Sequence, residues 1–331
     1  MHKVKPIYLL WLLLFLASSA QSEETFYSVQ YENDLFSADN RDRYYTSGMQ
    51  LSLLKKKTPP ALLKAISQRF PFYQNRSDLN WVQYTFGQKM FTPEDTQAID
   101  IQESDRPYAG YLYFKGTVMA NISQGADYDY GNQFEVTFGL VGPSALGEQA
   151  QTTIHEWIGS AIPNGWDNQL KDELALGLSY SRFWRLIRPL SNGLEFGINP
   201  QVSAALGNVY TYGSVGTMLR LGTNLRRDLS PPNISPGFPG IIYFEGAKQS
   251  SWYAYLGFEG RLVYRNIFLD GNSFVDSHSV EKENSVGDVQ YGVVYMFDDI
   301  RIAYSSMIRT AEFTTQNAVG HYGSINISLR Y

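Results

Sequence analysis

The sequence predicts an all-β fold: a transmembrane antiparallel β-barrel of about twelve strands, with a short helix packed at its extracellular rim. Three observations favour this class. The chain is rich in Tyr, Phe and Gly, with 24, 19 and 28 of them among 331 residues. About twelve segments alternate apolar and polar residues over roughly ten positions, as membrane-spanning strands do. After Gln21, no apolar run approaches the roughly twenty residues of a spanning helix.

The alternation is clearest in two segments. In 130–141, Phe134 and Val136 share one face of the predicted strand. At the chain's end Ile327 shares a face with Tyr331, and a last strand ending in an aromatic residue resembles the C-terminal signal of bacterial outer-membrane barrels. A soluble periplasmic β-sandwich or lipocalin-like barrel stays open as an alternative. The predicted strands are 26–33, 45–54, 80–91, 110–121, 130–141, 173–188, 193–207, 214–223, 251–264, 285–297, 299–309 and 321–331.

Residues 1–20 are predicted to be a secretory signal peptide, followed by an outer-membrane barrel domain over 21–331. Lys3 and Lys5 precede an apolar stretch at 7–16, and small residues stand just before the expected cleavage point. About ten apolar residues are too few to cross a bilayer as a helix. The absence of Cys excludes disulfides, and the net charge of −5 gives no case for nucleic-acid binding.

The predicted loops alternate between the two ends of the barrel. With both termini in the periplasm, 34–44, 92–109 and 142–172 lie outside the cell, and 55–79 lies inside. Segment 224–250, rich in Pro and Gly, also falls inside, although the periplasmic turns of such barrels are usually short. A plug of the lumen would accommodate its length.

Two loop segments have the residue spacing of helices. Residues 60–70 form an amphipathic helix on the periplasmic side. Residues 145–162 form a second helix on the extracellular side, with Ser144 as a suitable N-cap. Gln151 and His155 are four residues apart and share one of its faces. The apolar stripe of this helix consists of Ile154, Trp157, Ile158 and Ile162.

Polar residues gather where the first two strands leave and re-enter the sheet. Asn33 and Asp34 end one strand and Thr46 begins the next, which brings an amide, a carboxylate and a hydroxyl to one rim. On their own such residues are also common turn formers. The topology brings His155 to the same rim, where it could act as a general base near neutral pH.

The residue types favour activated water over a side-chain nucleophile. The sequence has no Gly-x-Ser-x-Gly and no His-Glu-x-x-His motif. Carboxylate and amide oxygens suit Ca²⁺, which could polarise an ester carbonyl while His155 takes a proton from water. We expect His278 to be solvated and His321 to lie at the rim. Further acidic residues of this rim, as ligands or as a solvated loop, are Glu94, Asp95, Asp100, Glu103 and Asp105.

The chain resembles the lipid A 3'-O-deacylase family, LpxR, of Gram-negative outer membranes. The residues that carry the resemblance are Glu32-Asn33-Asp34, Tyr45-Thr46-Ser47-Gly48, Gly87-Gln88, Phe91-Thr92-Pro93, Asp105-Arg106-Pro107-Tyr108-Ala109-Gly110, Gly142-Pro143, Gly147-Glu148-Gln149, Gln151, His155 and Gly159. The resemblance implies a twelve-stranded barrel whose site lies between the wall and an extracellular helix. It also implies Ca²⁺-dependent hydrolysis of the ester that holds the 3'-linked acyloxyacyl group of lipid A.

The resemblance assigns roles to five residues. It implies that Asp34 binds the metal ion and that Asn33 and Thr46 hold the geometry of the metal or the oxyanion. It matches His155 to the base on the helix, with Gln151 one turn before it.

The sequence departs from the family pattern at two places. A Lys-Arg pair thought to meet lipid A phosphate follows the Ser/Thr-Pro of the third loop, whereas 94–98 contains no basic residue here. The acid expected six residues after the helix histidine is replaced by Ala161. The nearest basic candidates are Arg41, Arg43 and Arg106. Ester hydrolysis is therefore better supported than selectivity for the 3' position.

These observations predict an acyl-ester hydrolase of the bacterial outer membrane that acts on lipid A with Ca²⁺, embedded in the membrane as a monomer. Two alternatives remain at this stage. One is an outer-membrane phospholipase, and the other is a non-enzymatic barrel that serves as a small pore or an adhesin.

Overall fold

The computed structural model describes residues 24–33, 47–70, 80–120, 128–234, 236–237 and 240–331. The predicted signal peptide over 1–20 lies outside the described residues, as do Asp34, Thr46, Arg41 and Arg43. The predictions for these residues therefore stay predictions.

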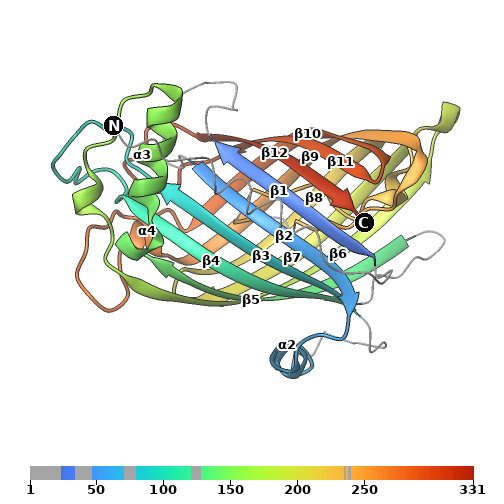
Figure 1. Ribbon diagram of the computed structural model, residues 1–331, viewed down its shortest axis with the longest axis horizontal. Coiled ribbons are helices and arrows are strands. Elements are labelled where there is room, and N and C mark those ends of the chain that lie inside the picture. Colours follow the sequence, from blue (N-terminus) through green and yellow to red (C-terminus); the bar gives the residue numbers. More distant parts are fainter. Residues whose placement is uncertain (1–23, 34–46, 71–79, 121–127, 235, 238–239) are drawn as a thin grey trace, which may run out of the picture.

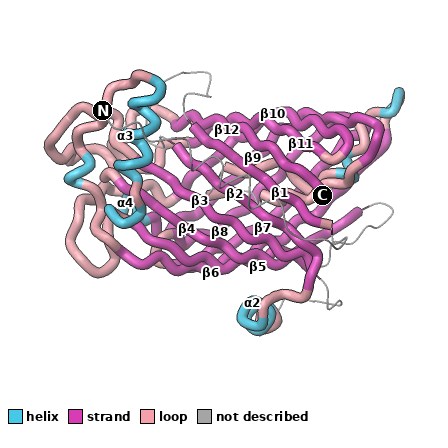
Figure 2. The backbone as a smooth tube through the Cα atoms, viewed as in Figure 1, coloured by secondary structure: helices cyan, strands magenta, loops and turns pink. Residues whose placement is uncertain are grey.

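In the described part of the chain, twelve antiparallel strands form one closed barrel (Figures 1 and 2). Each strand pairs with its neighbours in sequence, and β1 closes the ring by pairing with β12. The strands are β1 (Thr25–Asn33), β2 (Ser47–Lys57), β3 (Asn80–Phe91), β4 (Ala109–Ala120), β5 (Tyr128–Val141), β6 (Glu173–Pro189), β7 (Glu195–Gly207), β8 (Tyr210–Gly222), β9 (Ala247–Asn266), β10 (Ser285–Asp298), β11 (Ile300–Arg309) and β12 (Gly320–Arg330).

The predicted transmembrane barrel is confirmed, and most strand bounds agree within three residues. β3 has the predicted bounds, because its alternation is bordered by polar residues on one side and by Thr92-Pro93 on the other. β8 and β9 begin four residues earlier than predicted. β8 starts directly after a short turn that follows Gly207, where Thr211 Oγ1 bonds to the carbonyl of Gly207 at 2.9 Å. None of the described helices is long and apolar enough to cross a bilayer.

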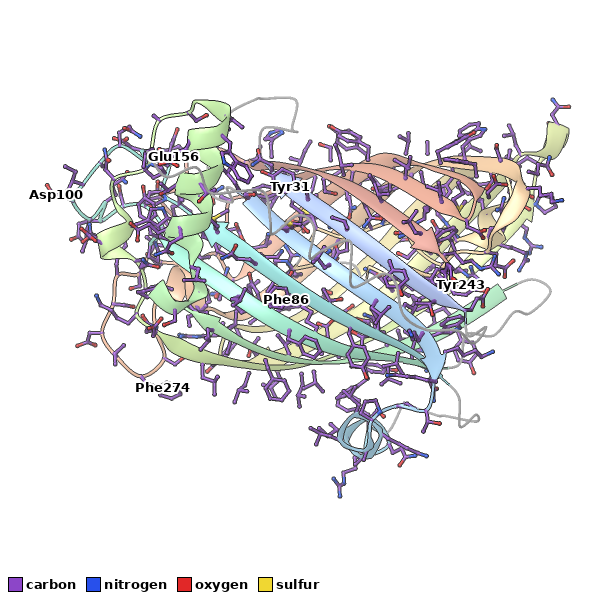
Figure 3. All side chains as sticks on the ribbon, viewed as in Figure 1. Tyr31, Phe86, Asp100, Glu156, Tyr243 and Phe274 are labelled. Atoms are coloured by element: carbon purple, nitrogen blue, oxygen red, sulfur yellow. The ribbon has the colours of Figure 1, made fainter. Side chains whose placement is uncertain are left out.

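Side chains alternate between the lumen and the outer face of the barrel, as a pleated strand requires. Where β1 meets β12, Val29 and Ile327 are paired, and both are exposed on the outer face. One residue away, Ser28 and Ser328 are buried in the lumen, where their hydroxyl oxygens are 3.0 Å apart. Apolar side chains such as Phe86 cover the outside of the wall (Figure 3). The barrel thus has a polar interior and an apolar exterior.

The long segment between β8 and β9 folds into the lumen, as its length suggested. Asp228 forms an ion pair with Arg301 of β11 at 2.8 Å, and both side chains are fully buried. The carbonyl of Asn233 accepts from Gln30 of β1 at 2.7 Å, and that of Pro236 accepts from Arg309 at 2.9 Å. Contacts with strands from several sides of the barrel make this segment a plug.

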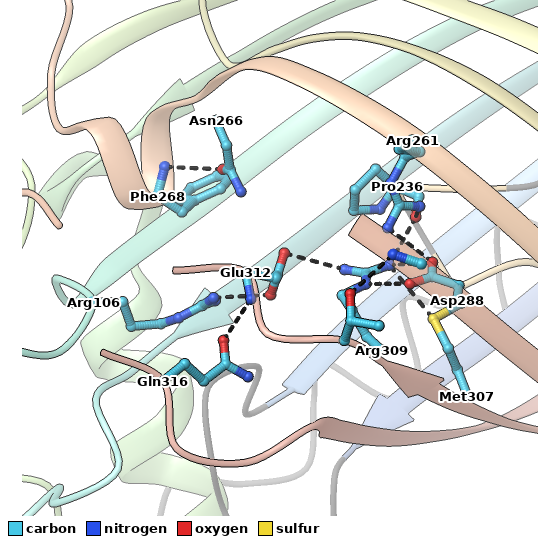
Figure 4. Close-up of polar contacts among 12 residues, drawn as sticks. Arg106, Pro236, Arg261, Asn266, Phe268, Asp288, Met307, Arg309, Glu312 and Gln316 are labelled. Atoms are coloured by element: carbon cyan, nitrogen blue, oxygen red, sulfur yellow. Dashed lines mark hydrogen bonds and ion pairs between the residues drawn. The ribbon is translucent and has the colours of Figure 1, made fainter. Parts of the chain in front are cut away.

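The extracellular loops cover the other end of the lumen. Phe268, in the short helix α4 (Ile267–Asp270), stacks on Phe91 with ring centroids 3.9 Å apart. Arg106 of the loop after β3 forms a buried ion pair with Glu312, at 2.9 Å (Figure 4). Arg309 lies 3.6 Å from the same carboxylate. This contact links the extracellular loops to charged side chains inside the barrel. Burial raises the pKa of Glu312, but the charges of Arg106 and Arg309 together hold it below its usual value.

The predicted helices are present, and both are shorter than expected. Residues 60–70 contain α2 (Ala61–Ser67), which begins after two prolines, and residues 145–162 contain α3 (Gly147–Ile158). α3 crosses the strand ends at one end of the barrel, and α2 lies beside the wall near the other end (Figure 1). This agrees with the predicted extracellular and periplasmic placements.

The first expected outcome concerns the plug. Asp228→Asn would leave the buried guanidinium of Arg301 without its countercharge, so we expect the free energy of unfolding to fall by about 3–5 kcal/mol. The matched control is Asp299→Asn, which removes the exposed partner of Arg330 and should cost less than about 1 kcal/mol. Guanidinium unfolding in lipid vesicles, followed by tryptophan fluorescence, measures both. Equal losses in the two variants would contradict a plug held by the buried pair.

The second expected outcome concerns the stability of the extracellular loops at low pH. Because the pKa of Glu312 is lowered in the folded state, its stabilisation is complete above the unfolded value of about 4.3 and disappears as the pH falls through the folded value. We expect amide exchange in 92–108, corrected for intrinsic rates, to accelerate in acid. In Glu312→Gln exchange should be fast already at neutral pH, with little further change. The exposed Glu156→Gln serves as control and should behave as the wild type.

Candidate functional site

Four residues form a row across the extracellular ends of β1 to β4. The strand register pairs Asn33 with Ser47, Ser47 with Met90, and Met90 with Gly110. Their neighbours Glu32 and Lys89 point into the lumen, where they form a buried ion pair at 3.3 Å. Because side chains alternate along a strand, the row itself faces outward. The end of β1 that the sequence singled out therefore belongs to the outer face of the barrel.

Helix α3 lies very close to the β3 and β4 members of this row. A Cβ atom on Gly110 would be 3.0 Å from the backbone nitrogen of Gly147, so neither position leaves room for a side chain. Met90 packs with Tyr108 and Trp166 in an apolar cluster that Ala150 and Ile154 of α3 join. Before the helix, the Ala145 carbonyl accepts from Gln88 of the wall at 2.6 Å. The site thus has the wall as one side and α3 as the other.

The start of α3 differs from the prediction. The N-cap residue is Leu146, in a left-handed conformation with φ of 58°, and no side chain caps the helix. Ser144, expected as N-cap, instead lies in a preceding 3₁₀ turn and bonds to Asp172 through its hydroxyl at 2.7 Å. Gly159 ends the helix with φ of 72°, a conformation that glycine adopts without strain.

The buried face of α3 also differs from the prediction. Of the expected apolar stripe, Ile154 packs against the wall, but Trp157 and Ile158 are 81% and 57% exposed. The buried residues are Gly147, Gln151 and His155, spaced by four. The reason is the surroundings: this helix lies on a wall whose outer face is apolar, so its outward side chains need not be polar. The polar pair of the helix is the part enclosed against the barrel.

His155 is 8% exposed and has a fixed ring orientation. Its Nδ1 lies 2.6 Å from the carbonyl oxygen of Ala161. A carbonyl oxygen only accepts, so Nδ1 carries the proton, and Nε2 is the basic nitrogen of the neutral ring. The backbone of Ala161 therefore orients the ring at the position where the family pattern has an acid. Sequence reasoning missed this because a carbonyl group has no residue-type signature.

Gln151 is held one turn before His155. Its Oε1 accepts from the indole N–H of Trp166 at 2.8 Å, and both side chains are almost fully buried. Within the described residues its Nε2 has no hydrogen-bond partner. A buried amide donor is costly to leave unbonded, so this N–H is available to a water molecule or a ligand. Trp166 was not predicted, and its spacing to Gln151 gives no motif that could have revealed it.

Of the polar residues predicted where β1 ends and β2 begins, the structure describes Asn33 but not Asp34 or Thr46. Asn33 is buried, and its amide nitrogen is 3.4 Å from the Tyr31 hydroxyl, a long hydrogen bond. Asp34 and Thr46 directly adjoin the described ends of β1 and β2 but lie outside the described residues. No group of three His, Cys, Asp or Glu side chains that could hold a metal ion occurs in the described ranges. The amide oxygen of Asn33 is a suitable donor for Ca²⁺, and a carboxylate would have to come from Asp34.

The acidic loop after β3 uses two of its carboxylates to hold itself together. Asp105 accepts from the backbone N–H groups of Glu94 and Arg106, each at 2.7 Å, and Asp95 accepts from that of Gln97. Burial raises the pKa of Asp105, while these backbone bonds act in the opposite direction. For these residues the structural role of a folded loop is the better interpretation.

The structure differs from the expected exposure of two further residues, Arg106 and His278. Arg106, a candidate for a phosphate contact, is 1% exposed and paired with Glu312, so it is not available to a substrate. His278, expected to be solvated, is half-buried, and its Nε2 is 2.7 Å from the carbonyl oxygen of Asp105. Both residues hold the extracellular loops together. His321 is the second residue of β12, at the rim, as expected.

Comparison with known proteins identifies the family and agrees with the fold. A family model described as "Outer membrane protein LpxR" matches residues 7–331. Among solved structures, LpxR from Salmonella typhimurium is similar with a TM-score of 0.73 at 18% identity, covering 92% of this chain and 99% of that chain.

Other matches are weaker. The β domain of the Bordetella autotransporter BrkA reaches a TM-score of 0.48 at 10% identity, covering 94% of this chain and 99% of that chain. A search of curated proteins by sequence gives no match. The family match spans nearly the whole sequence, and the barrel agrees with the fold of the solved family member. The chain therefore belongs to the LpxR family of bacterial outer membrane proteins.

Proposed function

We propose that this outer membrane protein hydrolyses the ester that links the 3'-acyloxyacyl group to lipid A. The observation that carries the proposal is His155, a buried histidine whose Nδ1 is fixed by a backbone carbonyl and which belongs to the helix face against the barrel wall. A site on the outer face of the wall suits a substrate that resides in the membrane. The proposed oligomeric state is a monomer.

In the proposed reaction, Nε2 of His155 takes a proton from water while the water oxygen attacks the ester carbonyl carbon. The bond from that carbon to the sugar oxygen then breaks, and His155 returns the proton to this leaving oxygen. The unpaired Nε2 of Gln151 is suited to donate to the negative oxygen that develops on the carbonyl. Trp166 holds Gln151 in place.

The proposed metal is Ca²⁺, with Asp34 as ligand and with Asn33 and Thr46 holding the metal or oxyanion geometry. Bound there, Ca²⁺ would polarise the ester carbonyl. Two oxygen-bearing side chains, Asn33 and Asp34, are consecutive where β1 ends, which suits a hard cation.

The first test replaces the base. In cells that express His155→Ala, we expect lipid A to keep the 3'-acyloxyacyl mass that the wild type removes, since loss of a general base costs about 100-fold or more. Mass spectrometry of lipid A measures this, and heat modifiability on a gel verifies the folded barrel. His278→Ala, at a histidine outside the site, should remain active. Deacylation by His155→Ala would contradict the mechanism, and an inactive wild type that releases phospholipid acyl chains would favour the phospholipase.

The second test addresses the positioning of Gln151. Trp166→Phe keeps an aromatic ring but removes the indole N–H, so we expect kcat to fall about five- to tenfold, the effect of one hydrogen bond, with KM nearly unchanged. Gln151→Ala should lower kcat further. Trp157→Phe, on the exposed side of α3, is the matched control and should leave kcat unchanged. A higher KM with an unchanged kcat in Trp166→Phe would contradict the assigned role.

The third test removes the metal ion. Chelation should abolish deacylation and added Ca²⁺ should restore it. In Asp34→Asn the Ca²⁺ concentration for half-maximal activity should rise on the order of tenfold or more, because a hard cation loses a charged ligand. Asp100→Asn, an exposed acid of the neighbouring loop, should give the wild-type curve. Full activity in the presence of chelator would rule out the proposed cofactor.

A further inference from the structure

The segment 47–70 has a one-sided charge. It contains five basic residues and no acidic one, over the end of β2, the connection and α2. The basic residues are Lys55, Lys56, Lys57, Lys64 and Arg69. All five lie within 55–69, from the far end of β2 to just after α2, which is at the opposite end of the barrel from α3 and apart from the site described above (Figure 1).

Helix α2 is packed on the outside of the barrel wall. Leu63 packs in a cluster with Val118, Phe134 and Val136. It also lies so close to Gly116 that a Cβ atom added there would be 3.1 Å from the Leu63 side chain. These wall residues alternate with Thr117 and Glu135, which bond to each other inside the barrel at 3.2 Å, so they belong to the outer face. The helix thus covers wall surface that lipid would otherwise contact.

The position of α2 corresponds to the periplasmic edge of the apolar band. Phe114 and Phe138, paired two residues toward the extracellular end from Gly116 and Val136, are exposed on the wall. Figure 1 shows α2 end-on, so its axis runs across the long axis of the barrel and within the plane of the membrane. An amphipathic helix in this orientation lies at the boundary between headgroups and acyl chains.

Aromatic and basic side chains surround α2 at this level. Phe70 stacks on Tyr180 with ring centroids 5.2 Å apart. The ammonium group of Lys57 lies 4.6 Å from the ring centroid of Tyr84, and the guanidinium of Arg182 lies 5.4 Å from that of Trp184. Tyr and Trp gather at membrane–water interfaces because one end of the side chain is apolar and the other polar.

The two flanks of α2 differ in chemistry. Leu62 is 60% exposed, while Lys64 lies about 200° farther round the helix, on the other flank. Arg69 follows the helix and is exposed, and Lys55 and Lys57 share the outward side of β2. An apolar flank beside a basic flank matches a lipid with acyl chains and a negatively charged headgroup.

We propose that α2 and the end of β2 bind an anionic phospholipid of the periplasmic leaflet, with its phosphodiester beside the basic residues. The phosphate accepts from the ammonium and guanidinium groups, and the acyl chains lie along the apolar wall next to Leu62. The net charge of the segment selects the lipid class. Because 47–70 contains no acidic residue, it attracts an anionic headgroup more strongly than a zwitterionic one.

Native mass spectrometry of the purified full-length barrel in a non-ionic detergent tests this proposal. The probes are phosphatidylglycerol and phosphatidylcholine with identical acyl chains, added in equal amounts. We expect retained phosphatidylglycerol to exceed phosphatidylcholine, and Lys64→Gln with Arg69→Gln to weaken its retention on the order of tenfold. The matched control, Lys171→Gln with Lys248→Gln, removes two exposed charges elsewhere and should bind as the wild type.

Three outcomes would overturn the proposal: equal retention of both lipids by the wild type, wild-type retention by the Lys64 and Arg69 variant, or an equal loss in the control. A heat-induced gel shift verifies that each variant is folded. Lys55→Gln provides a second route that leaves α2 intact, with an expected weakening of about fivefold. None of these measurements depends on deacylation, so the proposal can fail or hold independently of the proposed enzyme.

Discussion

The alternation of side chains along paired strands is the constraint on which the rest of this structure depends. In a bilayer every backbone polar group must be bonded, so the sheet closes on itself and each residue faces either the lumen or the outside. Glu32 faces inward and pairs with Lys89, and their neighbours Asn33 and Met90 consequently face outward, Met90 beneath α3. The buried ion pair behind the wall and the site in front of it are thus two sides of the same strand ends.

The closed ring encloses a lumen that the segment between β8 and β9 enters as a plug. The interior of the barrel is polar, and the plug supplies backbone carbonyls and carboxylates to buried guanidinium groups, as Asp228 does for Arg301. At the extracellular end the packing is aromatic, through Phe91 and Phe268. The plug occupies much of the interior, whereas the outer face is the part of the barrel wall that a ligand within the membrane would meet.

The sequence allowed the strands to be predicted closely, because a period of two is a direct consequence of the pleat and survives in every strand. It also brought Asn33, Gln151 and His155 to one rim. The apolar stripe of α3 predicted the wrong buried face, because apolar residues such as Trp157 face outward on a membrane protein as readily as inward. The carbonyl of Ala161 and the indole of Trp166 could not be predicted, because backbone groups and distant partners leave no spacing to recognise.

The close approach of Gly110 and Gly147 brings the helix directly onto the outer wall, and this has a kinetic consequence for the proposed hydrolysis. A molecule held in the membrane meets such a site by sliding within a two-dimensional sheet, never by arriving from bulk water. The quantity that governs encounter is then the number of target molecules per area of membrane. Lipid or detergent that does not react dilutes the target even when its amount per volume is constant, so rates measured in micelles and in native membranes are comparable only at equal surface density.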